Sequence, residues 1–98
     1  MDYQNLMVTD EFVATIGSLD PPATPEDIAG ILQALDELDA EPASTRNRLH
    51  LLDRELTGWW SLTPPFPADQ SLRVLVVPER GHHGGFWRIG PVTRHCWR

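Results

Sequence analysis

The order of the residue patterns constrains the fold most, because helical patterns fill the first part of the chain and β patterns fill the rest. The clearest helix begins at Thr24, which can cap it, and Pro25 suits its first position. We expect this helix to end near Leu38, because Asp39 would otherwise fall on its apolar face. That face is predicted to consist of Ile28, Ile31, Leu32, Leu35 and Leu38.

A further helix is predicted over residues 44–57, because small hydroxyl residues precede leucines at helical spacing and Gly58 can stop it. Residues 72–77 are rich in β-branched side chains and indicate a strand, and residues 86–89 indicate its return strand. A long glycine-containing loop over residues 78–85 would join them. The sequence therefore predicts an α+β fold in which helices are followed by a β-hairpin.

The segment before the clear helix has two interpretations. Thr9 can cap a helix whose apolar positions follow helical spacing, and Gly17 can stop it. The β-branched residues in the same stretch make a strand over residues 5–16 the alternative.

Charge is divided unevenly along the chain. Residues 1–45 carry ten carboxylates and no Lys or Arg, whereas residues 46–98 carry eight arginines and four carboxylates, so the net charge of −6 hides two opposite halves. The length predicts one domain over residues 1–98, with an acidic helical part (1–58) and a basic, tryptophan-rich β part (59–98). The basic part can bind an anion, and the acidic part can shield it or meet a different partner.

Composition predicts a cytoplasmic protein without a membrane partner. The single cysteine, Cys96, cannot form an internal disulfide, the N-terminus lacks the pattern of a signal peptide, and no apolar run is long enough to span a bilayer. No metal site or cofactor is predicted. An extended segment would separate His82 and His83 from His95 by about 20 Å, and zinc ligands must meet at one ion.

Residues 24–89 resemble a winged helix-turn-helix domain. Residues 25–32 look like the first helix of the motif, and residues 42–52 look like a turn that leads into a recognition helix with an arginine-rich first turn. Residues 72–89 would form the wing. The resemblance implies a small DNA-binding regulatory protein without catalytic residues.

By this resemblance, Arg46, Asn47 and His50 would read base edges, and Arg48 and Arg54 would contact phosphates. An ordinary solvated helix face is the alternative for these arginines. The complete DNA-binding set that the resemblance implies is Ser44, Thr45, Arg46, Asn47, Arg48, His50, Arg54, Arg80, His82 and His83.

A second interpretation is a protein-interaction or inhibitor module that binds a basic protein, with its acidic surface standing in for a nucleic acid. The negative end of the long helix is crowded with carboxylates, which opposes the helix dipole unless a cation lies nearby. That cation could belong to this molecule or to a partner, and a homodimer is compatible with the sequence. The predicted interaction residues are Asp36, Glu37, Asp39 and Glu41.

A third interpretation follows if residues 5–16 form a strand. The order β-α-α-β-β-β is similar to that of the small ribonuclease toxins of the RelE type. Arg73, Arg88 and His95 would then be candidates for a catalytic face. The acidic total charge opposes an enzyme directed at RNA.

Overall fold

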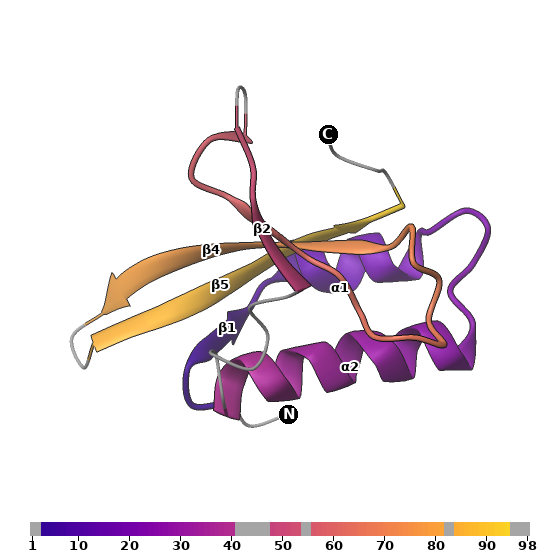
Figure 1. The fold of residues 1–98 in the computed structure, drawn as a ribbon, viewed down its shortest axis with the longest axis horizontal. Helices are drawn as coiled ribbons and strands as arrows, with labels where there is room; N and C mark the ends of the chain where they lie inside the picture. The colour runs from indigo at the N-terminus through magenta and orange to yellow at the C-terminus, as the bar shows by residue number, and fades with distance from the viewer. Residues whose placement is uncertain (1–2, 41–47, 54–55, 82–83, 95–98) are drawn as a thin grey trace.

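The computed structural model describes residues 3–40, 48–53, 56–81 and 84–94. Within them, the chain forms one mixed five-stranded sheet of order β1-β5-β4-β3-β2 and two helices (Figure 1), which confirms the predicted α+β class. The elements in chain order are β1 (Leu6–Val8), α1 (Asp10–Gly17), α2 (Pro25–Ala40), β2 (Leu49–Leu51), β3 (Trp60–Leu62), β4 (Arg73–Gly81) and β5 (Gly84–Thr93).

The first segment is a short strand followed by a helix, so the helix prediction holds from Asp10 and the strand alternative holds only for Leu6–Val8. Strand β1 runs parallel to β5, with Leu6 opposite Trp87. Thr9 then caps α1, because its hydroxyl accepts the Phe12 N–H at 3.2 Å and donates to the Ile89 carbonyl at 2.7 Å. Helix α1 continues along β5 and covers the edge that β1 leaves open.

Helix α2 begins as predicted and ends two residues later, at Ala40. Thr24 and Asp27 form a reciprocal cap: the Thr24 hydroxyl accepts the Asp27 N–H at 3.1 Å, and the Asp27 carboxylate accepts the Thr24 N–H at 3.0 Å. The buried face is turned slightly from the predicted stripe, because Ile28 is 40% exposed and small residues take part instead. That face consists of Asp27, Gly30, Ile31, Ala34, Leu35 and Leu38.

The hydrophobic core lies between the helices and one face of the sheet. Val74 and Val76 of β4 are fully buried in it, together with Ile89 of β5. Trp60 and Trp87 are half-buried at its border, and their rings meet edge to face with centroids 6.2 Å apart.

The predicted helix over residues 44–57 is wrong, because residues 49–51 form β2, antiparallel to β3. Leu49 packs against the core, while the N–H of Leu52 donates to the Trp59 carbonyl at 2.9 Å. Leucine spacing in this short stretch fits a helix as well as a strand. The free edge of β3 decides between them, because it offers backbone partners that an isolated helix face does not.

The predicted loop over residues 78–85 is also wrong in its extent, because β4 continues to Gly81 and β5 begins at Gly84. Pro78 stands opposite Trp87, whose N–H points the other way, to the carbonyl of Asn5 at 2.8 Å. Pro78 and Trp87 therefore form a pair without hydrogen bonds between its members. The missing N–H of the proline removes no hydrogen bond between β4 and β5. The result is a long two-stranded arm that projects beyond the end of α2 (Figure 1).

No helix among the described residues combines the length and the apolar character needed to cross a bilayer.

Candidate functional site

The sheet has an open face on the side away from the helices. Because side chains alternate along a strand and Val74 and Val76 point to the core, Arg73 and Leu75 point to this open face. The strand register then places further polar side chains beside them. In the register His50 is opposite Ser61 and Ser61 is opposite Leu75, while Arg88 is opposite Val77.

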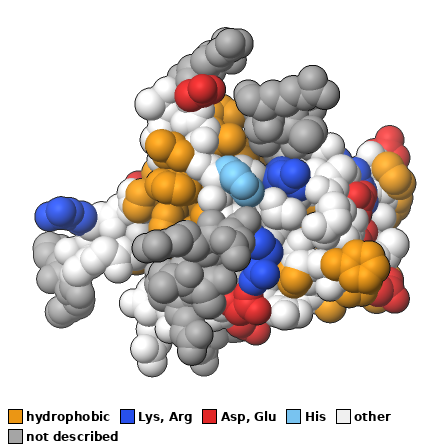
Figure 2. Space-filling view, viewed as in Figure 1, with side chains coloured by type: hydrophobic (Ala, Val, Ile, Leu, Met, Phe, Trp, Pro, Cys, Tyr) orange, Lys and Arg blue, Asp and Glu red, His pale blue; other side chains and the backbone are white. Residues whose placement is uncertain are grey.

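We define the open-face cluster as His50, Ser61, Arg73 and Arg88. It comes from four different strands, β2, β3, β4 and β5, which only the folded sheet brings together. Figure 2 shows a histidine near the middle of the visible face, with a basic side chain beside it.

The two arginines of this cluster already have intramolecular partners. Arg73 donates from Nη1 to the carbonyl oxygens of Gln70 and Leu72, the latter at 2.7 Å. Arg88 donates from Nε to the Glu79 carboxylate at 3.1 Å, and its guanidinium carbon lies 5.4 Å from the centroid of the Trp59 ring. An anion at this face would therefore compete with Glu79 for Arg88.

Ser61 brings an unsatisfied hydroxyl to the same face. The residue is 3% exposed, and its Oγ has no hydrogen-bond partner among the described atoms. Buried hydroxyls are normally hydrogen-bonded, so Ser61 lacks a partner that such a group usually has. His50 is exposed on the neighbouring strand. The open-face cluster therefore places two guanidinium groups, an imidazole and a hydroxyl on the same face of the sheet.

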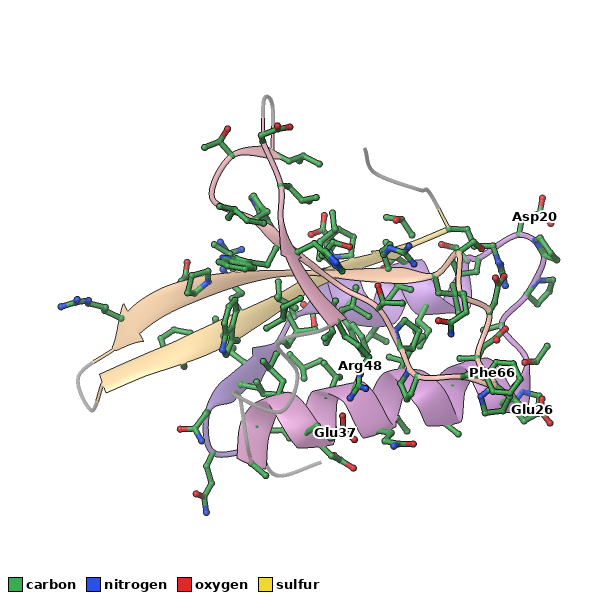
Figure 3. The ribbon with its side chains drawn as sticks, viewed as in Figure 1. Asp20, Glu26, Glu37, Arg48 and Phe66 are labelled. Atoms are coloured by element: carbon green, nitrogen blue, oxygen red, sulfur yellow. The ribbon has the colours of Figure 1, made fainter. Side chains whose placement is uncertain are left out.

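Of the residues predicted to bind DNA, the structure describes three, and they do not share one helix. Arg48 forms an ion pair with Glu37 of α2 (Figure 3), so it joins the edge of the sheet to the helix. His50 lies on the open face and Arg80 is exposed on the projecting arm. The other seven lie outside the described residues: Ser44, Thr45, Arg46, Asn47, Arg54, His82 and His83.

The acidic residues predicted to meet a partner mostly bind within the molecule. Glu37 pairs with Arg48, and Asp39 accepts the backbone N–H of Asn5 at 2.6 Å. Burial, followed by the nearby Asp36 carboxylate, raises the pKa of Tyr3 to about 12. The cation and the hydrogen-bond donors that the carboxylates at the C-terminal end of α2 need are therefore largely supplied within the molecule. Glu41 lies outside the described residues.

Sequence reasoning missed an ionic network centred on Arg94 at the end of β5. Its guanidinium lies 3.2 Å from Asp69 and 3.7 Å from the buried Asp27, and it donates to the Pro21 carbonyl at 2.8 Å. Backbone N–H donors, mainly that of Thr24 on Asp27 and that of Ser71 on Asp69, lower the pKa of each carboxyl, and Arg94 adds to the effect. The Thr24-to-Asp27 spacing was the one local signal for this network.

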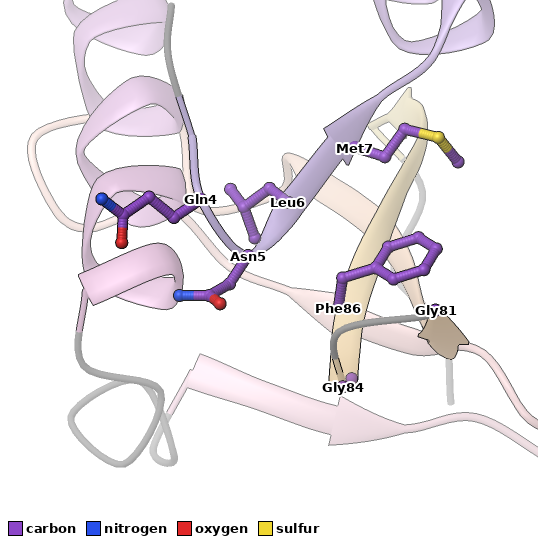
Figure 4. Close-up of a pocket in the computed structure, with 8 residues that line it drawn as sticks. Gln4, Asn5, Leu6, Met7, Gly81, Gly84 and Phe86 are labelled. Atoms are coloured by element: carbon purple, nitrogen blue, oxygen red, sulfur yellow. The ribbon is translucent and has the colours of Figure 1, made fainter.

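A shallow hollow of about 310 Å³ lies between the start of β1 and the tip of the arm (Figure 4). Met7 and Phe86 line one side of it, and the amides of Gln4 and Asn5 lie near the other. None of the four residues of the open-face cluster lines it, although Met7 stands opposite Arg88 in the β1–β5 register. Within the described part of the chain, no group of three or more His, Cys, Asp or Glu residues could hold a metal ion.

Comparison with known proteins places the fold. No protein-family model and no curated protein matches this sequence. A chain in the crystal structure of the toxin-antitoxin complex RelBE2 from Mycobacterium tuberculosis is similar in structure, with a TM-score of 0.61 and 20% sequence identity. The match covers 93% of this chain and 96% of that chain, so the two share a fold over nearly their whole lengths.

Proposed function

We propose that this protein is the toxin-like member of a toxin–antitoxin pair and that it acts by binding a protein partner. The fold likeness to a chain of the RelBE2 complex over 93% of the sequence carries this proposal. The element order supports it, because β1, α1 and α2 precede a run of antiparallel strands. This order agrees with the resemblance to RelE-type toxins, which required a strand within residues 5–16.

The charge distribution supports a basic partner. The chain carries a net charge of −6, and the carboxylates of Asp10, Glu11, Asp20 and Glu26 are exposed. Such a surface attracts a cationic protein and repels nucleic acid.

Co-expression tests the proposal. The full chain, with an affinity tag, is produced together with the proteins encoded immediately beside its own gene, and the purified material is analysed by size-exclusion chromatography and mass spectrometry. We expect a stoichiometric complex with one of these proteins, with an affinity that falls as salt rises. Purification of the chain free of each of them would contradict the proposal. Parallel binding assays use random duplex DNA, because residues 49–51 of the predicted recognition helix form strand β2.

A second candidate function is RNA cleavage at the open face. The observation that favours it is that Arg73 and Arg88 share that face with His50 and the unsatisfied Ser61 hydroxyl. Arginines can hold the phosphates of an RNA backbone, and an imidazole can move the proton of a 2′-hydroxyl. Against it stand the internal partners of both arginines and the acidic total charge. The remaining predicted residue, His95, lies outside the described residues.

The second candidate function is tested by measuring the rate at which the purified protein cleaves RNA. If the open-face cluster cleaves RNA, His50→Ala should lower the rate by about two orders of magnitude, the usual loss when a general acid or base is removed. His50 is exposed on an edge strand, so the variant should keep its fold by circular dichroism. Equal cleavage by the variant and the parent would point to a contaminating nuclease or a different site.

A further inference from the structure

Phe66 is the most exposed large apolar side chain among the described residues, at 84%. It stands on the connector between β3 and β4, and the backbone on both sides of it is firmly held. Pro64 is fully buried, and the Gln70 side chain donates to the carbonyl oxygens of Pro64 and Ala68 at 3.1 and 2.9 Å. An aromatic ring displayed on a braced connector loses little conformational entropy on binding, which is typical of an anchor residue.

The connector is also tied to the rest of this end of the molecule. The backbone N–H of Asp69 donates to the Asp27 carboxylate at 2.8 Å, so the connector is bonded to the first turn of α2. Arg94 bonds Asp69 on one side and the carbonyl of Pro21, in the connector before α2, on the other. Two connectors distant in sequence are thereby joined into one fixed surface.

One carboxylate lies beside the exposed ring, and a second lies farther along the same end of the molecule. The Pro65 carbonyl contacts α2 at Gly30, where an added Cβ would lie 3.2 Å from that oxygen. Glu26 is one helical turn before Gly30 on the same side of α2, which places it next to Phe66, as Figure 3 shows. Asp20 lies farther along the same end (Figure 3), and neither carboxylate takes part in an ion pair among the described residues.

We propose that Phe66, Glu26 and Asp20 form a docking surface for an arginine-bearing segment of a basic protein partner. An arginine side chain can stack its guanidinium plane on the exposed phenyl ring and donate hydrogen bonds to a carboxylate at the border of the ring. Figure 2 shows the same combination, with apolar side chains bordered by acidic ones at this end of the molecule. Lysine fits less well, because its compact ammonium cannot stack and pair at once.

This inference rests on the proposed function, since it names the surface that the protein partner would occupy. Arg94, the arginine at this end, is already paired with Asp27 and Asp69, so its charge is offset and a cationic segment can approach Phe66. The partner chemistry follows from charge complementarity: an apolar anchor inside an acidic border selects a basic chain and rejects a phosphate backbone.

A defined probe tests the surface directly. A fluorescent nonapeptide in which arginine alternates with leucine is titrated into the full-length protein, beside the same peptide with neutral citrulline at each arginine position. We expect the arginine peptide to bind, and Phe66→Ala to weaken it about three- to fivefold, as the loss of a cation–π contact predicts. Phe66→Tyr should retain the affinity, and Glu26→Gln should weaken binding and flatten its dependence on salt.

Val13→Ala is the matched control, because Val13 is 60% exposed on α1 and does not belong to this surface. It should leave the peptide affinity unchanged. Equal binding of the peptide by Phe66→Ala and the parent, or equal binding of the citrulline peptide, would overturn the inference.

Affinity measurements with the co-purified partner distinguish a failure of the docking surface from a failure of the proposed function. If a partner co-purifies and its affinity is the same for Phe66→Ala and Glu26→Gln as for the parent, the docking surface is wrong and the proposed function stands. If the peptide depends on Phe66 but none of the neighbouring gene products co-purifies, the proposed function fails instead.

Discussion

At the scale of single residues, carboxylates of α2 bind groups in other segments of the chain. Asp27 caps α2 and accepts a hydrogen bond from the connector, Glu37 pairs with Arg48, and Asp39 holds the start of β1 through Asn5. Apart from the local cap between Asp27 and Thr24, each of these bonds joins segments that are distant in sequence. The acidic residues of α2 therefore hold other segments of the chain in place and also contribute surface charge.

The ionisation of Tyr3 is sensitive to another carboxylate of α2, that of Asp36. It is the only tyrosine in the chain, and its pKa is raised from 10.0 to about 12 by burial and then by Asp36. We predict that the absorbance change of tyrosinate has a midpoint near pH 12 in the folded protein, and that Asp36→Asn moves it toward 10. A spectrophotometric titration measures both. A midpoint near 10 in the parent protein would mean that Tyr3 is not packed beside Asp36.

At the scale of elements, glycines set how closely two connections approach the helix and the sheet. A Cβ at Gly30 would lie 2.6 Å from the Ala68 Cβ, and a Cβ at Gly90 would lie 2.7 Å from the Trp59 ring. The first glycine lets the Phe66 connector lie against α2. The second lets Trp59 cover the open face of β5 beside Arg88.

Gly30→Ala tests this packing. Alanine normally stabilises a helix interior by about 0.5–1 kcal/mol over glycine, but the clash with Ala68 should reverse the sign and give a net loss of about 1–3 kcal/mol. Urea unfolding followed by tryptophan fluorescence measures the difference. Gly17→Ala is the matched control, because no atom lies within 4 Å of its added Cβ, and it should be neutral or stabilising. A stabilised Gly30→Ala variant would contradict the close approach.

At the scale of the whole molecule, the Arg94 network joins the C-terminal end of β5 to both connectors that flank the core. Asp27 is 5% exposed and has its pKa lowered below 3.8, first by the Thr24 and Asp69 backbone donors, while Arg94 contributes less. A carboxyl with a lowered pKa in the folded state stabilises the fold above its unfolded pKa. That stabilisation is lost as the pH falls through the folded pKa.

We therefore predict that the melting temperature of this protein is level near neutral pH and falls below about pH 5. Asp27→Asn should lower stability at pH 7 and reduce the slope of the acid decline, because the variant has one fewer group to protonate. Calorimetry or circular dichroism melts across pH 2–8 measure both effects. Glu26→Gln, in the same helical turn but exposed, should leave the slope nearly unchanged. Equal slopes for Asp27→Asn and the parent would contradict the role of Asp27.

What the sequence by itself determined is local. The Thr9 and Thr24 caps, the span of α2 and the β4–β5 hairpin could be predicted, because caps, apolar spacing and β-branched runs act between residues close along the chain. The α+β class followed from them. The open-face cluster was only partly predictable: Arg73 and Arg88 were candidates, but Ser61 joins them only through strand pairing.

Tertiary structure decided the rest. The leucines of residues 49–52 suit a helix or a strand, and the free edge of β3 settled the choice by supplying backbone partners. Folding also pairs charges from the acidic and basic halves of the sequence, because Arg48 contacts Glu37 and Arg94 contacts Asp27 and Asp69. Charge attraction depends on distance in space, and a linear sequence does not contain those distances.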